Sequence, residues 1–168
     1  MFAALIAGGT FIAIPVGPVP IVLQNFFALL AGLVLGPLSG GASIALYLLA
    51  GILGAPVFAG FTGGITRFAG PTGGFLIGYL CMAVLAGFIA GNSINKTPLI
   101  RIILAVVTGL LIVYVPGILW LKHITGLNWT GALAAGFIPF IPGDIIKGII
   151  AVLIAPGLRK TAADHLYS

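Results

Sequence analysis

The stretch Pro139-Phe-Ile-Pro-Gly-Asp-Ile-Ile-Lys-Gly-Ile-Ile-Ala151 places Asp144 and Lys147 in a segment that is otherwise suited to lipid. A charged side chain at the centre of a membrane helix costs roughly 2.5–3.5 kcal/mol on insertion scales. At helical spacing the two side chains lie about 60° apart on one face, and the isoleucines cover the opposite face. The pattern predicts either an ion pair that only joins two helices or a buried polar contact with a ligand, and we favour the ligand.

The composition indicates an integral membrane protein. Hydrophobic residues make up 61% of the 168-residue chain and charged residues 5%, against roughly 45–50% and 25% in soluble domains. Because each span needs about 20 residues, the length suits one all-α transmembrane domain, residues 1–168, of about five or six helices. The net charge of +5 is spread over loops, so it does not form the basic stripe of a nucleic-acid-binding protein.

Apolar segments separated by Gly- and Pro-rich loops predict six spans. The segments cover residues 2–14, 21–35, 42–53, 72–90, 99–119 and 133–154. Pro139 and Pro142 interrupt the last segment, so we expect its regular helix to begin near Gly143. An even number of spans puts both termini on one side of the membrane.

The basic residues predict which side the termini occupy. Four of them fall on the side of the termini: Lys96, Arg101, Arg159 and Lys160. Arg67 and Lys122 fall on the opposite side. Cytoplasmic loops carry an excess of Lys and Arg, so we expect cytoplasmic termini.

The long loop over residues 54–72 has the composition of a binding loop. Its glycines expose backbone N–H groups, phenylalanines such as Phe58 supply apolar faces, and Arg67 is its one charged residue. Such a loop can close over a ligand that has an apolar body and an acidic end. The alternative is a re-entrant or surface loop with Arg67 at the lipid headgroups.

Three further polar residues within the apolar segments are candidates for the site. Gln24 opens the second segment and is suited either to bind a ligand amide or to cap the helix. Tyr47 and Tyr79 lie inside segments, where core packing is the alternative to lining a cavity.

No motif supplies chemistry or energy. Residues 91–97 lack the glycine that precedes the lysine of a phosphate-binding loop. The sequence has no Cys/His cluster for a metal and no serine credibly paired with a histidine and an acid. We therefore expect no enzymatic activity, no metal and no cofactor.

Five ordered motifs cover nearly the whole chain: Pro18-Val-Pro-Ile-Val-Leu-Gln24, Leu33-Val-Leu-Gly-Pro37, Gly54-Ala-Pro-Val-Phe-Ala-Gly60, Gly70-Pro-Thr-Gly-Gly-Phe75 and Pro142-Gly-Asp-Ile-Ile-Lys147. Together they resemble the signatures of the BioY family, the biotin-specific substrate-capture (S) components of energy-coupling-factor (ECF) transporters. The resemblance implies a bundle of six transmembrane helices with long extracellular loops, in the cell membrane of a prokaryote.

The resemblance also implies a ligand and partners. Biotin would bind near the outer face as the transported ligand, and a membrane coupling subunit with two cytoplasmic ABC ATPases would drive its release. Small residues on the first helix dock the coupling subunit in such proteins, and Ala3 and Ala7 match that pattern.

The chemistry of biotin suits the candidate residues. Asp144 is suited to accept a charge-assisted hydrogen bond from a ureido N–H. Lys147 and Arg67 are candidate cations for the biotin carboxylate or for balancing Asp144, and Phe58 and the tyrosines would cover the rings. The alternatives are capture of another vitamin, or a small proton-coupled carrier in which Asp144 titrates.

Overall fold

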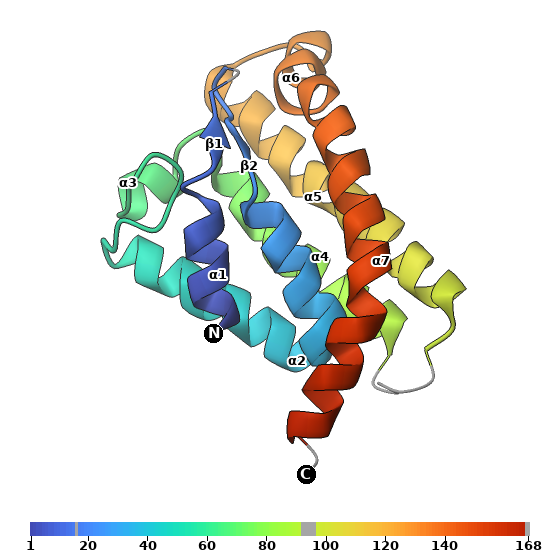
Figure 1. Ribbon diagram of the computed structural model, residues 1–168. Helices are drawn as coiled ribbons and strands as arrows, with labels where there is room; N and C mark the ends of the chain where they lie inside the picture. The colour runs from blue at the N-terminus through green and yellow to red at the C-terminus, as the bar shows by residue number, and fades with distance from the viewer. Residues whose placement is uncertain (16, 92–96, 167–168) are drawn as a thin grey trace.

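The computed structural model (Figure 1) describes residues 1–15, 17–91 and 97–166, with side chains up to residue 162. Five helices form a bundle: α1 (Phe2–Gly9), α2 (Gln24–Ile52), α4 (Gly73–Ala90), α5 (Leu99–Thr125) and α7 (Ile141–Leu166). The remaining elements lie between them: α3 (Ile65–Phe68), α6 (Trp129–Gly136), the 3₁₀ helix η1 (Ile138–Phe140) and an antiparallel hairpin of β1 (Ala13–Ile14) and β2 (Ile21–Val22). The hairpin, α3 and α6 lie toward the end of the bundle that is opposite the C-terminus.

A sharp bend divides α2 into two membrane helices. Gly36 has φ 79° and ψ −179°, a conformation that favours glycine, and Pro37 follows it without an N–H to donate. The two halves correspond to the predicted segments 21–35 and 42–53. With α1, α4, α5 and α7 they make six helices, so the predicted six-helix bundle is confirmed.

Four helical runs of the described chain are each long and apolar enough to cross a membrane. They are α2, α4, α5 and the run from α6 into α7, residues 129–162. The expectation of a multi-pass membrane protein is thereby confirmed.

Several predicted boundaries differ from the observed ones. The first helix ends at Gly9 rather than at residue 14, because the chain after Thr10 turns to pair β1 with β2. The loop 54–72 contains a short helix, α3. The last segment is interrupted as predicted, because η1 separates α6 from α7, and regular helix begins at Ile141, close to the predicted Gly143. It is longer than the predicted residues 133–154, since α6 begins at Trp129 and α7 ends at Leu166.

Close backbone contacts join α2, α4 and α5. A Cβ atom on Gly32 would lie 2.3 Å from the Ala83 carbonyl oxygen of α4, and one on Gly78 would lie 2.7 Å from the Val113 carbonyl oxygen of α5. Such distances are below any ordinary contact, so glycine is required at both positions. Small residues at a helix interface allow this approach in a bilayer, where lipid provides no hydrophobic drive for association.

We expect Gly32→Ala to destabilise the protein by about 1–3 kcal/mol, because the added methyl must push α2 and α4 apart. Gly8→Ala is the matched control, since its Cβ would meet nothing within 4 Å and alanine favours a helix. Thermal unfolding in detergent measures both. A melting temperature for Gly32→Ala equal to that of Gly8→Ala would contradict this account of the interface.

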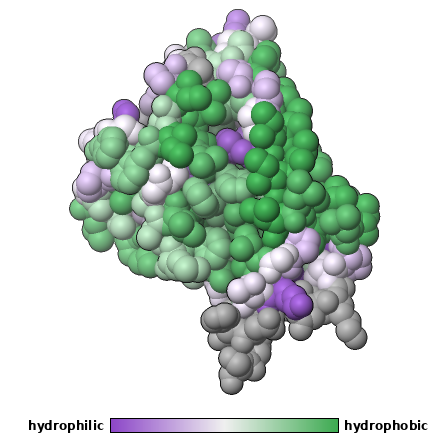
Figure 2. Space-filling view, viewed as in Figure 1, coloured by the Kyte–Doolittle hydropathy of each residue, from purple (hydrophilic) through white to green (hydrophobic). Residues whose placement is uncertain are grey.

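The two faces predicted for α7 are confirmed. Asp144 and Lys147 are each 8% exposed, and Ala151 and Ala155 are fully buried on the same side. The opposite side is exposed and consists of Ile145, Ile146, Ile149, Ile150 and Leu153. In the view of Figure 2, hydrophobic residues cover most of the surface, and hydrophilic residues appear in one hollow and near the ends of the bundle.

A buried arginine ties three helices together at the end of the bundle nearer the C-terminus. Arg159 of α7 is 1% exposed. Its Nη1 donates to the carbonyl oxygen of Leu33, which has no helical partner because Pro37, four residues later, lacks an N–H. Its Nη2 donates to the Gly91 carbonyl oxygen at the end of α4, at 2.6 Å, and to Thr97 Oγ1 at 3.1 Å. Arg159 thus completes the hydrogen bonding of the α2 bend.

Candidate functional site

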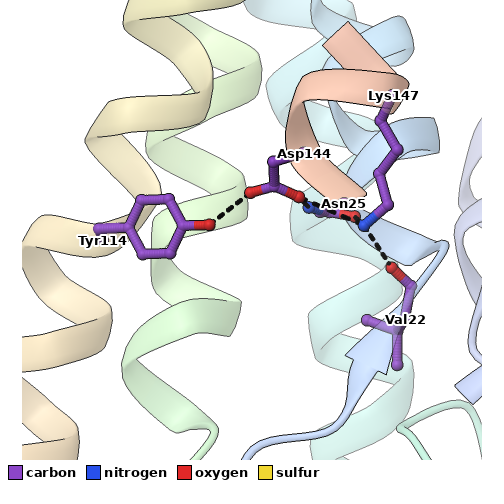
Figure 3. A network of polar contacts seen from close by, with 5 residues as sticks. All are labelled: Val22, Asn25, Tyr114, Asp144 and Lys147. Carbon is purple, nitrogen blue, oxygen red and sulfur yellow. Dashed lines mark hydrogen bonds and ion pairs between the residues drawn. The ribbon is translucent and has the colours of Figure 1, made fainter. Parts of the chain in front are cut away.

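Asp144 lies at the centre of a buried polar network that joins α2, α5 and α7 (Figure 3). Its Oδ1 accepts a hydrogen bond from Asn25 Nδ2 at 2.9 Å. Its Oδ2 accepts one from the Tyr114 hydroxyl at 2.5 Å. Both carboxylate oxygens are therefore hydrogen-bonded, as a buried charge requires.

Lys147 is hydrogen-bonded within the same network. Its Nζ donates to the Val22 carbonyl oxygen at 2.9 Å and to Asn25 Oδ1 at 2.8 Å. It also forms an ion pair with Asp144 Oδ1 at 3.3 Å. Three acceptors match the three donors of an ammonium group. Asn25 bridges the pair, because its amide N–H donates to the acid and its carbonyl oxygen accepts from the base.

Local structure brings these groups together. Asp144 and Lys147 are three residues apart in a helix and so share a face. The Val22 carbonyl and Asn25 flank the junction between β2 and α2, and Tyr114 comes from α5. Sequence reasoning favours Gln24 over the neighbouring Asn25 as a ligand-binding amide, and it does not single out Tyr114. The available signal was a polar side chain inside an apolar segment, which must find a hydrogen-bond partner away from water.

A small cavity of about 70 Å³ lies next to this network. Its walls come from the hairpin, the start of α2, the loop before α4, and α4 itself. The lining residues are Pro18, Val19, Pro20, Val22, Gln24, Phe58, Ala59, Arg67, Pro71, Thr72, Phe75, Leu76 and Tyr79. Val22 belongs both to the cavity wall and to the polar network, because its carbonyl oxygen accepts a hydrogen bond from Lys147.

Four of the predicted site residues line this cavity: Gln24, Phe58, Arg67 and Tyr79. The Arg67 guanidinium places a positive charge at the cavity wall, and its Nε donates to Thr62 Oγ1 at 3.0 Å. Phe58 is 2% exposed, and its ring packs directly on Gly51, in the space that a larger side chain there would need. The cavity therefore combines one cation with aromatic walls.

Tyr47 lies behind the cavity and is not one of its lining residues. Its hydroxyl accepts from Gln24 Nε2 at 2.9 Å and donates to the Val57 carbonyl oxygen at 3.1 Å. Its ring meets that of Phe58 edge to face, with centroids 5.7 Å apart. Tyr47 therefore holds Gln24 and Phe58 in place rather than lining the cavity.

A larger apolar groove of about 550 Å³ runs between α5 and α7. Only Tyr114 and Asp144 among its lining residues are polar, and they are hydrogen-bonded to each other. Its rims are exposed aliphatic side chains, such as Leu111 and Ile149. The groove has the size of a ligand pocket but offers few polar groups, whereas the small cavity has the chemistry of one.

The fold and the site define a multi-pass membrane protein with an enclosed charge pair beside a cavity that loops cover. The sequence model of the BioY family matches residues 1–164. The chain belongs to the BioY family, and the family resemblance noted in the sequence is confirmed.

Curated relatives and a solved structure are similar along most of their length. The probable biotin transporter BioY of Pyrococcus horikoshii is 45% identical over 159 residues, which are 95% of this chain and 92% of that protein. The biotin transporter BioY of Thermotoga maritima is 41% identical over 98% of this chain and 95% of its own. A crystal structure of the S-component for biotin from an ECF-type ABC transporter superposes with a TM-score of 0.86 at 34% identity, covering 95% of this chain and 87% of that one.

Proposed function

We propose that this chain is the biotin-binding membrane subunit of an ECF-type ABC transporter, which captures biotin at the outer face of a prokaryotic cell membrane. The observation that carries the proposal is the fully hydrogen-bonded Asp144–Lys147 pair beside a cavity with its own cation, Arg67. Relatives named as biotin transporters and the structural similarity to a biotin S-component support the choice of ligand.

The two charged regions suit the two ends of biotin. The ureido ring has two N–H donors and one carbonyl acceptor, so Asp144 is suited to accept from it. Lys147 Nζ already donates to three acceptors, so it would donate to the ureido carbonyl in exchange for one of them. The valerate carboxylate then extends toward Arg67. Phe58 and Tyr79 supply apolar faces between the two ends. Asn25 and Tyr114 hold Asp144 in its orientation through hydrogen bonds.

A ligand of this size requires the cavity to widen. The cavity measures about 70 Å³, and pockets for small molecules measure roughly 300–1,000 Å³. The parts best able to move are the loops that cover it, because most of their described residues are exposed or half-buried.

The proposal includes a membrane coupling subunit, two cytoplasmic ABC ATPases and cytoplasmic termini. The small residues of α1 are suited to docking a partner helix closely. Ala3 and Ala7 are half-buried against the core of this chain. Ala4 is exposed and Gly8 has open space where a side chain would stand, so these two widen the small-residue surface that a partner can reach.

Calorimetry of the purified chain with biotin and with biotin methyl ester tests the role of Arg67. We expect Arg67→Met to weaken biotin binding about tenfold to a hundredfold, because a charge-assisted hydrogen bond contributes roughly 1.5–3 kcal/mol. The native chain should bind the ester more weakly than biotin by a similar factor, and Arg67→Met should bind both ligands equally.

Lys122→Met is the control for loss of one positive charge. Lys122 lies over the Trp129 ring at 5.1 Å, outside the cavity lining, so its replacement should leave both affinities unchanged. If Arg67→Met still distinguished biotin from its ester as strongly as the native chain does, Arg67 would not bind the carboxylate. If the native chain bound no biotin, the proposed function would be wrong.

A further inference from the structure

Two separate chain segments form the cover of the cavity. The hairpin of β1 and β2 contributes Pro18, Val19 and Pro20, and the central loop, residues 54–72, contributes Phe58, Arg67 and Pro71 among others. Among the described residues, no hydrogen bond joins the hairpin to the central loop. As far as the described residues go, the two halves of the cover can therefore separate without losing a hydrogen bond between them.

A pair of exposed aromatic rings links the two halves. Phe11, just before β1, stacks on Phe61 of the central loop, with ring centroids 4.7 Å apart and planes inclined by 23°. Phe11 is 57% exposed and Phe61 is 68% exposed. A stacked pair of this kind shifts an opening equilibrium roughly twofold to tenfold. That is strong enough to bias the cover toward closure and weak enough to be reversible.

The backbone of Phe61 is held in an uncommon conformation. Its φ is 57°, the left-handed region that bulky residues rarely adopt. The turn is fixed by paired backbone bonds between Phe58 and Thr62, with Phe58 N donating to the Thr62 carbonyl oxygen at 2.8 Å. Strain of this kind persists where the surroundings impose it, and it is concentrated at functional sites. Here it presents the Phe61 ring to Phe11.

The same turn is connected to the cavity. Phe58 at one end of the turn lines the cavity, and Thr62 at the other end accepts the hydrogen bond from Arg67 Nε. A ligand that draws the Arg67 guanidinium toward itself therefore acts on the turn that carries Phe61.

We propose that Phe11 and Phe61 form a clasp, which keeps the hairpin and the central loop together over the cavity and opens to admit and release the ligand. The inference rests on the proposed function, because the ligand is taken to be biotin. It goes further in assigning control of ligand exchange to two exposed residues outside the cavity.

A reversible cross-link tests the clasp. Phe11→Cys and Phe61→Cys are combined in a Cys81→Ala background, since Cys81 is exposed, and joined by a short bifunctional thiol reagent that a reductant cleaves. Linking before biotin is added should prevent loading of radiolabelled biotin. Linking after loading should stop exchange with unlabelled biotin, and reductant should restore both. The two single-cysteine variants treated with the same reagent are the controls.

Ring removal provides a second measurement. Phe11→Ala and Phe61→Ala should each speed biotin dissociation roughly twofold to tenfold, and the double variant should be no faster than either single variant, because each removes the same contact. If linked protein exchanged biotin at the unlinked rate while the native chain bound biotin normally, the clasp alone would be overturned. If the native chain bound no biotin, the clasp and the proposed function would both be wrong.

Discussion

Lys147→Met is expected to weaken biotin binding about tenfold to a hundredfold, through loss of a charged donor to the ligand, and to destabilise the protein as well. Removing one partner of a buried ion pair costs about 3–5 kcal/mol, because the other charge stays buried without compensation. In this protein the Asp144 carboxylate would keep its bonds from Asn25 and Tyr114 but lose its cation. Calorimetry with biotin and thermal unfolding in detergent measure the two effects.

The double variant Asp144→Asn/Lys147→Met separates stability from binding. Replacing both members of a buried pair by neutral residues is often close to neutral for stability, so the melting temperature should recover most of the loss while biotin binding stays weak. Lys160→Met, at an exposed position of α7, controls for the loss of one charge. Unchanged biotin affinity in Lys147→Met would remove Lys147 from the site.

Arg159→Met is expected to destabilise the protein by about 3 kcal/mol or more, because each buried polar group left without its partner costs roughly 1–3 kcal/mol. The carbonyl oxygens of Leu33 and Gly91 would both lose the donor that Arg159 supplies. Hydrogen exchange should become faster on both sides of the α2 bend, since the bend depends on this contact. Thermal unfolding and exchange mass spectrometry measure the change.

Two variants define the cause of that loss. Arg101→Met removes an exposed arginine at the same end of the bundle, and surface changes of this kind usually stay within about 0.5 kcal/mol. Arg159→Lys keeps the charge but not the planar fork of donors, so an intermediate loss is expected. A stability for Arg159→Met equal to that of Arg101→Met would mean that the α2 bend does not need the arginine.

The sequence alone was sufficient to predict the class of protein and the helix face that carries Asp144 and Lys147. A chain this apolar has to lie in a membrane, and the insertion cost of two charges three residues apart indicated that Asp144 and Lys147 face the protein interior. Helical periodicity then predicted the exposed isoleucines on the opposite side. These conclusions depend on composition and on contacts within one helix, which are properties of local sequence.

Only the tertiary structure decided how the charges are compensated. The Val22 carbonyl, Asn25 and Tyr114 come from parts of the chain far from Asp144 and Lys147 in sequence, and no local pattern predicts such pairings. The same holds for Arg159, whose acceptor at Leu33 exists because Pro37 interrupts the hydrogen bonding of α2. Hydrophobic periodicity specifies which face of a helix is buried, but the partner of a buried polar group depends on which other helix packs against that face.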